Sequence, residues 1–184
     1  MAATANVCDF GWHGPEFELP SVDGSTWRLA DVQGERGTLV MFICNHCPYV
    51  RAILPRLVST VRELQAMGIG VAAISSNDVQ AYPDDSFEAM QRLARDMDFS
   101  FPYLFDESQA VARAWGAVCT PDFFGFNAAG ELQYRGQFDA SRKEAAPPGS
   151  RRDLFEAMRQ IAETGQGPRA QVPSVGCSIK WKDA

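Results

Sequence analysis

Residues 38–50 read TLVMFICNHCPYV, and this stretch decides the expected fold. Its first six residues, 38–43, are mostly apolar or β-branched, which predicts a strand buried on both faces. Two cysteines follow in the sequence CNHC, residues 44–47, and Pro48 comes directly after them. Beyond Pro48 apolar residues recur at helical spacing, which predicts a helix. A strand, two thiols and a helix N-terminus therefore meet at one point.

A thiol at such a junction faces unpaired backbone N–H groups and the positive end of a helix dipole, which favour its thiolate. Read simply as a Cys-x-x-Cys pair, Cys44 would be the attacking thiol. Pro48, however, suits the first position of a helix, which puts Cys47 at the N-cap. Cys44 then closes the strand or begins the loop. We therefore predict Cys47 as the nucleophile and Cys44 as its partner thiol.

Size and composition exclude several classes of protein. The chain has 184 residues, enough for one domain with a sizeable core. Its net charge of −6 and the lack of a basic run argue against a nucleic-acid partner. Apolar runs stay far below the roughly 20 residues of a membrane span. Residues 1–10 lack the basic and apolar regions of a signal peptide, so we expect a cytoplasmic location.

The five cysteines fit thiol chemistry better than structural disulfides. An odd count, without a signal peptide or a small cysteine-dense framework, argues against structural bridges. In a reducing compartment, a close cysteine pair is typically redox-active or metal-binding. This expectation applies to Cys44 and Cys47.

The rest of the chain alternates between strands and helices. Residues 17–29 alternate apolar and polar side chains around Asp23-Gly24, which predicts a hairpin. Residues 71–76 predict a second buried strand, parallel to the first because a helix connects them. The remaining expected elements are a helix capped by Asp84 or Asp85, a strand at 101–105, a helix at 108–115, strands forming an antiparallel hairpin at 117–135, and a helix at 153–163. We predict a single domain over 1–184, with a core of about 17–163 and a tail at 164–184.

This order of elements, with a cysteine pair at the first central strand-to-helix junction, resembles the thioredoxin fold. The N-terminal hairpin and the extra helix before Phe101 resemble the larger peroxiredoxin-like branch, the alkyl hydroperoxide reductase/thiol-specific antioxidant type. The fragments that carry the likeness are FICNHCPY, CTPDFF, YRGQFD and PSVGCSIKWK. The resemblance implies an α/β fold with a central mixed β-sheet flanked by helices, an N-terminal β-hairpin and an extra helix insertion.

The resemblance also carries implications for the site. Thr120-Pro121 matches the family's cis-proline loop, which lies beside the active thiol. Pro55 stands eight residues after Cys47, the offset of the helix-kinking proline of thioredoxins from their first cysteine. In this register Cys44 replaces the Thr or Ser that holds the peroxide in peroxiredoxins, and Pro121 replaces their activating arginine. The transition-state stabilisation that those groups provide would be lost, so disulfide exchange is favoured over efficient peroxide reduction.

Three further residues near the expected site, His46, Cys177 and Cys119, each allow two interpretations. His46 either stabilises the Cys47 thiolate as an imidazolium or faces solvent, and Asn45 shares its loop as a supporting residue. Cys177 is either a distant resolving thiol or a structural anchor of the tail. Cys119 is either near the active thiols or a small buried residue. Cys8 lies in an N-terminus that we expect to be loose and is read as incidental.

Charged residues after the hairpin, Arg135, Asp139 and Arg142, predict a solvated face.

Metal binding is an alternative function of a different class from redox catalysis. Cys44, His46 and Cys47, with Cys177 as a further candidate, would suit Cu(I) or Zn(II), but the set is incomplete by the usual coordination counts.

The sequence therefore predicts a thiol-disulfide oxidoreductase without cofactor or bound metal. The alternatives are a weak thiol-dependent, peroxiredoxin-like peroxidase with antioxidant activity, and a copper or zinc binding or delivery protein. Expected partners are a protein or small-molecule disulfide or thiol, a hydroperoxide for the peroxidase alternative, and a cellular thiol reductant. We expect neither nucleic acid nor membrane as a partner.

Overall fold

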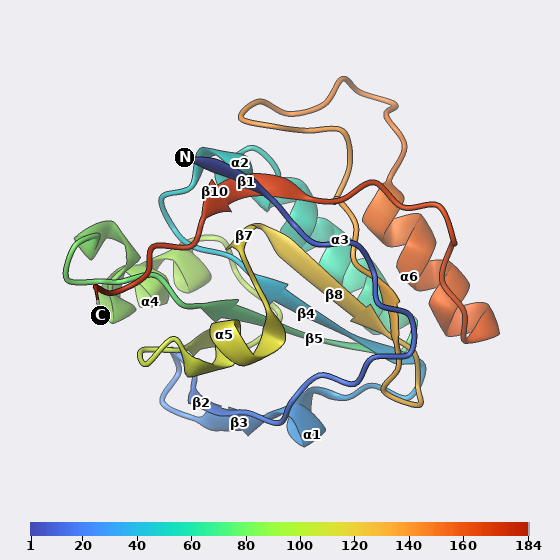
Figure 1. Cartoon of the computed structure of the whole chain (residues 1–184), viewed down its shortest axis with the longest axis horizontal. Helices are drawn as coiled ribbons and strands as arrows, with labels where there is room; N and C mark the ends of the chain where they lie inside the picture. Colours follow the sequence, from blue (N-terminus) through green and yellow to red (C-terminus); the bar gives the residue numbers. More distant parts are fainter. Residues whose placement is uncertain (184) are drawn as a thin grey trace.

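The strand that leads to the two cysteines, β4 (Gly37–Phe42), lies at the centre of a five-stranded sheet (Figure 1). The computed structural model describes residues 1–183. The sheet order is β6-β5-β4-β8-β9. The other strands are β5 (Ile69–Ser75), β6 (Tyr103–Phe105), β8 (Asp122–Phe126) and β9 (Leu132–Tyr134). β4, β5 and β6 run parallel while β8 and β9 pair antiparallel, so the predicted mixed sheet is confirmed.

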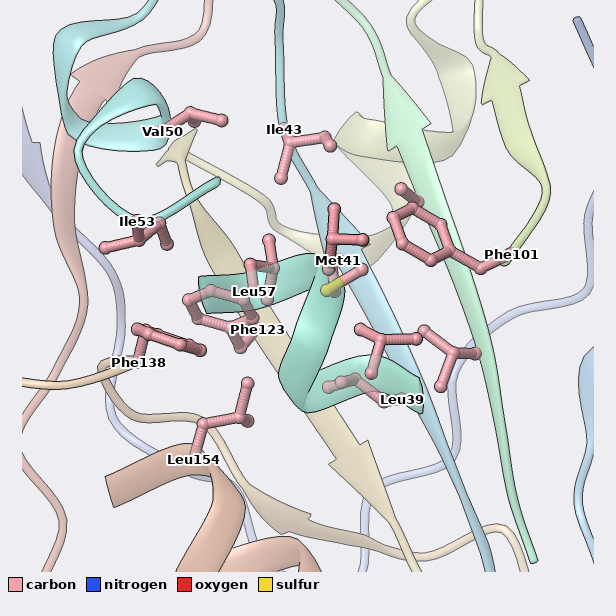
Figure 2. Packing of buried hydrophobic residues seen from close by; sticks show 14 of the residues in the cluster. Leu39, Met41, Ile43, Val50, Ile53, Leu57, Phe101, Phe123, Phe138 and Leu154 are labelled. Carbon is pink, nitrogen blue, oxygen red and sulfur yellow. The ribbon is translucent and has the colours of Figure 1, made fainter. Parts of the chain in front are cut away.

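β4 is buried on both faces, as its apolar run predicts. Side chains alternate across a strand, so Leu39 and Met41 pack into one hydrophobic cluster and Val40 and Phe42 into the other. Figure 2 shows the first cluster, where Met41 lies among side chains from several elements. A strand held from both sides in this way gives the following cysteines a fixed base.

Helices cover both faces of the sheet. α3 (Leu54–Ala66) and α6 (Asp153–Thr164) pack on the Leu39 face, and α4 (Phe87–Asp96) joins them through Met90. The opposite face is covered by α5 (Ala110–Trp115), α1 (Leu29–Val32) and the hairpin of β2 (Glu18–Pro20) with β3 (Thr26–Arg28). The predicted N-terminal hairpin and extra helix are therefore present.

The helix expected after Pro48 is divided in two. α2 (Pro48–Arg51) ends after one turn, and α3 begins at Leu54. Pro55 explains the break, because it has no N–H to donate and its ring would clash with the carbonyl of Arg51 in a continuous helix. The expected cap at Asp84 or Asp85 is also wrong. These residues belong to the 3₁₀ helix η1 (Pro83–Asp85), and Ser86 caps α4 by accepting from the Ala89 N–H at 3.2 Å.

The chain ends form a second sheet that the sequence does not predict. β1 (Ala2–Thr4) pairs with β10 (Val175–Ser178), which pairs with β7 (Cys119–Thr120), all antiparallel. Figure 1 shows β1 and β10 running side by side past α2. The expectation of a loose N-terminus is thus wrong for residues 2–4. Within residues 1–183, no helix has both the length and the apolar character needed to cross a membrane.

Candidate active site

The two cysteines lie on the turn between β4 and α2. The Ile43 N–H still donates to the Ile74 carbonyl at 3.0 Å, so the sheet holds the chain up to the residue before Cys44. Cys47 is the N-cap residue of α2, with extended backbone angles of φ −66° and ψ 123°, and Pro48 occupies the first helical position. The register that Pro48 predicts is therefore the one observed. Both thiols are fully buried.

The Cys47 sulfur has different partners in its two protonation states. As a thiol it donates to the Thr120 carbonyl at 3.2 Å. As a thiolate it accepts hydrogen bonds, and these lower its pKa to about 4 against the opposing effect of burial. The largest contribution comes from the Cys44 thiol, followed by the Cys177 thiol and the Thr120 hydroxyl. Cys47 is therefore the thiolate of the group at neutral pH.

Cys44 is held in the opposite state. Its hydrogen bond to Cys47 and its burial raise its pKa well above the ordinary value of a thiol. Its sulfur also lies 3.4 Å from the Thr120 hydroxyl oxygen. One thiolate and one protonated thiol thus lie together at Thr120, which is the arrangement that a nucleophile and its partner require.

Asp85 organises the loop and is a residue that sequence reasoning misses. Its carboxylate is completely buried. One oxygen accepts from the backbone N–H groups of Asn45 at 2.8 Å and His46 at 3.2 Å. The other lies 2.5 Å from the His46 Nδ1 and accepts from the Asn77 side-chain amide at 2.9 Å. Its negative charge also contributes to the raised pKa of Cys44, so it helps to keep the thiolate on Cys47.

Asn45 fixes the loop through its side chain and backbone. Its side-chain oxygen accepts from the Tyr103 hydroxyl at 2.8 Å, and its amide donates to the Asp84 carbonyl at 3.0 Å. Its own carbonyl accepts from the Arg51 Nε at 3.1 Å. Asn45 is therefore a positioning residue for the cysteine loop.

The His46 ring is hydrogen-bonded to Asp85. Among the residues that the structure describes, no hydrogen bond joins it to Cys47. Its ring also stacks on Tyr82, with the ring centroids 5.7 Å apart and the planes 5° from parallel. About a quarter of the side chain, 24%, is exposed. A role in stabilising the Cys47 thiolate stays a prediction.

The predicted cis-proline loop completes the site. The Thr120-Pro121 peptide bond is cis, and both the hydroxyl and the carbonyl of Thr120 face the cysteine pair. β10 brings Cys177 opposite Thr120 in the strand register. The Cys119 thiol turns instead toward the Pro121 carbonyl at 3.5 Å, and burial raises its pKa. The site therefore contains three sulfurs, from Cys44, Cys47 and Cys177.

The remaining predicted positions lie apart from these sulfurs. Burial raises the pKa of the half-buried Cys8 to about 11, which leaves it an ordinary protonated thiol. Arg135 and Asp139, expected on a solvated face, are buried. Arg135 pairs with the buried Asp122 at 3.0 Å, and its guanidinium lies 4.3 Å from the centre of the Phe124 ring. The expectation is wrong for these two residues, because a buried ion pair leaves no local pattern in the sequence, whereas Arg142 is exposed as expected.

One group of potential metal ligands forms in the site. Cys44, His46 and Asp85 each offer a ligand atom, and these atoms lie within 4.8 Å of one another. The Asp85 oxygens already accept hydrogen bonds from Asn45, His46 and Asn77. A metal ion bound here would have to replace contacts that hold the loop.

Comparisons with known proteins find two solved structures of similar sequence that cover nearly the whole chain. No curated protein matches the chain. An uncharacterized conserved protein from Geobacillus kaustophilus is 41% identical, with a TM-score of 0.94, over 100% of this chain and 98% of that one. A hypothetical protein from Sinorhizobium meliloti is 36% identical, with a TM-score of 0.91, over 98% and 99% of the two chains.

A more distant structure shares the fold. The thioredoxin domain of a thiol-disulfide oxidoreductase from Bacteroides vulgatus is 16% identical, with a TM-score of 0.62, over 83% of this chain and 97% of that one. The model of the AhpC/TSA family matches residues 10–135. The chain therefore belongs to the AhpC/TSA family and is a thiol-based oxidoreductase with a thioredoxin-like fold.

Proposed function

We propose that the protein carries out thiol–disulfide exchange, with Cys47 as the attacking thiol and Cys44 as the resolving thiol. The observation that carries the proposal is the placement of both sulfurs at Thr120 beside the cis peptide, with Cys47 at the N-cap of α2 and donating to the Thr120 carbonyl at 3.2 Å, and Cys44 3.4 Å from the Thr120 hydroxyl oxygen. In this arrangement the pKa of Cys47 is lowered and that of Cys44 is raised, so the attacking and waiting sulfurs are distinguished before a substrate arrives. The thiolate is the nucleophile in such chemistry.

The reaction proceeds in two displacements. The Cys47 thiolate attacks one sulfur of a substrate disulfide, a mixed disulfide forms, and the second substrate sulfur leaves as a thiolate. Cys44, once deprotonated, attacks the Cys47 sulfur and releases the first substrate sulfur. The substrate disulfide gains two electrons, and a Cys44–Cys47 disulfide remains, which an external thiol reductant returns to the dithiol form.

The surroundings favour the second step. In the mixed disulfide Cys47 no longer carries a charge, so the hydrogen bond that keeps the Cys44 proton is lost. The pKa of Cys44 then falls toward its ordinary range. The Asp85 contacts keep the loop between the two cysteines in place while the bonds change. Cys44 therefore becomes reactive only after Cys47 has reacted.

A disulfide-reduction assay tests the proposal, with a cysteine-linked peptide disulfide as substrate and a small dithiol as reductant. Turnover should be lost in Cys47→Ser, while Cys44→Ser should stop after one mixed disulfide per protein. Cys8→Ser is the matched control, because this half-buried thiol lies apart from the site. Full turnover by Cys47→Ser would contradict the proposal.

Peroxide reduction by the same Cys47 is the second candidate, and membership of the AhpC/TSA family supports it. Cys47 would attack the peroxide, release water or an alcohol, and become a sulfenic acid that a thiol reduces. The polarising groups that peroxiredoxins use are replaced here by Cys44 and Pro121, so we expect slow peroxide consumption. Measuring peroxide and disulfide reduction in parallel on the same variants separates the two functions.

Partners and location follow from the same proposal. The expected partners are a disulfide-bearing protein or small molecule and a cellular thiol reductant, and the antioxidant role would require the peroxidase activity. A cytoplasmic location stays a prediction from the sequence. Elemental analysis of protein purified without a metal-binding tag tests the copper or zinc alternative, which a stoichiometric metal content would support.

A further inference from the structure

The C-terminal strand β10 occupies the sheet edge next to the reactive sulfur. β10 pairs antiparallel with β7, and Cys177 lies opposite Thr120. The carbonyl of Thr120 is also the group that accepts from the Cys47 thiol at 3.2 Å. Any residue opposite Thr120 is therefore brought to the nucleophile, and in β10 that residue is Cys177, one of the groups that lower the pKa of Cys47.

The backbone of β7 also restricts which residue can stand directly before that cysteine, at position 176. A Cβ atom added to Gly176 would lie 1.9 Å from the Thr120 carbonyl oxygen and 2.5 Å from its carbon. Both are backbone atoms beside the cis peptide, and neither is the end of a flexible side chain. Only glycine fits at this position, so the edge accepts an extended strand that carries Gly-Cys.

β10 also closes the site to the outside. Cys44 and Cys47 are fully buried, and β10 lies against α2 directly beside them. Contacts on both sides hold it, since the Ser174 hydroxyl donates to the Pro121 carbonyl at 2.7 Å and the Ile179 N–H to the Val118 carbonyl at 3.1 Å. A large substrate cannot reach Cys47 while β10 is in place.

We propose that the edge of β7 is the docking site for an extended, cysteine-bearing polypeptide with glycine directly before its cysteine, and that β10 holds this site until such a strand replaces it. Strand addition to a sheet edge supplies backbone hydrogen bonds and reads alternate side chains. The inference rests on the proposed function, because the docked cysteine is the one that Cys47 attacks. The inference names polypeptides as the substrate class of that function, and it makes β10 a part of the same chain that competes with the substrate for β7.

The rival route is entry through Cys177, with Cys177 reacting first and passing the disulfide to Cys47. The Cys177 thiol faces Cys47, and burial together with the hydrogen bond to Cys47 raises its pKa to about 11. A protonated thiol is a poor nucleophile. A relay would have to begin at this protonated thiol, whereas strand exchange begins at Cys47, which donates to Thr120 directly opposite the docked cysteine.

Two peptides test the proposal on the intact wild-type protein. One is PSVGCSI, the sequence of residues 173–179, and the other is PSVVCSI, with valine in place of glycine. Each cysteine is supplied as a mixed disulfide with a chromogenic aromatic thiol. When Cys47 attacks the peptide sulfur, a Cys47–peptide disulfide forms and the aromatic thiolate leaves, which absorbance records. In the Cys44→Ser variant, which cannot release the peptide, mass spectrometry locates this disulfide.

We expect the glycine peptide to couple to Cys47 at least about tenfold faster than the valine peptide, because the added side chain must clash with Thr120. Gly176→Val should prevent β10 from pairing, raise the rate for both peptides and keep the preference for glycine. Equal rates for the two peptides on the wild-type protein would overturn the proposal, and this comparison needs no variant to fold.

Cysteine variants separate the remaining outcomes. Cys177→Ser should still couple the glycine peptide at Cys47, whereas loss of coupling there would establish the relay and overturn strand exchange. Full coupling in Cys47→Ser would instead show that the proposed function itself is wrong. Coupling at Cys47 without any glycine preference would leave the proposed function standing and reject only the docking site.

Discussion

Two segments bring cysteines to the same point, and they do so by different physical means. The turn after β4 carries Cys44 and Cys47 on a strand that is buried on both faces, and a buried carboxylate fixes the loop. β10 carries Cys177 on a four-residue strand whose partners, β1 and β7, are no longer than three residues. The first segment is built to stay in place while bonds change, and the second is held by contacts that a competing strand can replace.

The largest expected effect separates the two cysteines by role. Cys47→Ser should lower disulfide turnover by about a thousandfold or more, because a serine hydroxyl is not ionised at neutral pH. Cys177→Ser should keep most of the turnover, since the backbone pairing of β10 does not need the thiol. The measurement is the initial rate of disulfide reduction for both variants. A loss of equal size in Cys177→Ser would remove the distinction between the segments.

Asp85→Asn tests the rigidity of the first segment. The asparagine amide has the shape of the carboxylate, but it replaces one acceptor oxygen with an NH₂ group that faces the donors of the loop. We therefore expect the free energy of unfolding to fall by about 3 kcal/mol. Denaturant unfolding measures it. Asp84→Asn is the matched control, because this neighbouring side chain is exposed and should change stability by less than about 0.5 kcal/mol. Equal stability of Asp85→Asn and the wild type would contradict the role of Asp85.

The pH dependence of alkylation compares the two segments in one sample. The pKa of Cys47 is lowered to about 4, so its thiolate fraction, and hence its rate, should stay level between about pH 6 and about pH 8. The pKa of Cys177 is raised to about 11, so its rate should rise about tenfold per pH unit over the same range. Mass spectrometry of peptides labelled by a small neutral reagent gives both profiles. A tenfold rise per unit at Cys47 would contradict its assignment as the thiolate.

Ser174→Ala gives the smallest expected effect and tests how β10 is held. Removing the buried hydrogen bond to the Pro121 carbonyl should lower the free energy of unfolding by about 1 kcal/mol and speed amide exchange in β10. Ser150→Ala is the control, because Ser150 donates to the Pro147 carbonyl at 2.6 Å in an exposed loop. Similar exchange in β10 for both variants would show that Ser174 does not hold the strand.

Sequence alone predicts the first segment well because its signals are local. The apolar run before Cys44 predicts β4, and Pro48 predicts the N-cap position of Cys47. The mixed sheet and the cis peptide at Thr120-Pro121 follow from the family resemblance and are confirmed. β4 and the N-cap position of Cys47 can both be recognised from the stretch of residues 38–50 alone.

The second segment escapes prediction because its structure depends on distant partners. β10 contains Gly176, which gives a weak strand signal, and its pairing with Thr120 spans more than fifty residues of chain. Asp85 appears in the sequence only as a possible helix cap, since nothing nearby indicates that Asn45 and His46 will donate to it. The groups that tune the thiols therefore become visible only in the folded chain.

The most direct test of the central claim is to trap the mixed disulfide in two variants and locate it. Cys44→Ser and Cys47→Ser are each mixed with the same peptide disulfide, and mass spectrometry of proteolytic fragments identifies the protein cysteine that carries the peptide. The account predicts that Cys44→Ser accumulates the peptide on Cys47 and that Cys47→Ser accumulates none. Accumulation of the peptide on Cys44 in the Cys47→Ser variant would contradict it.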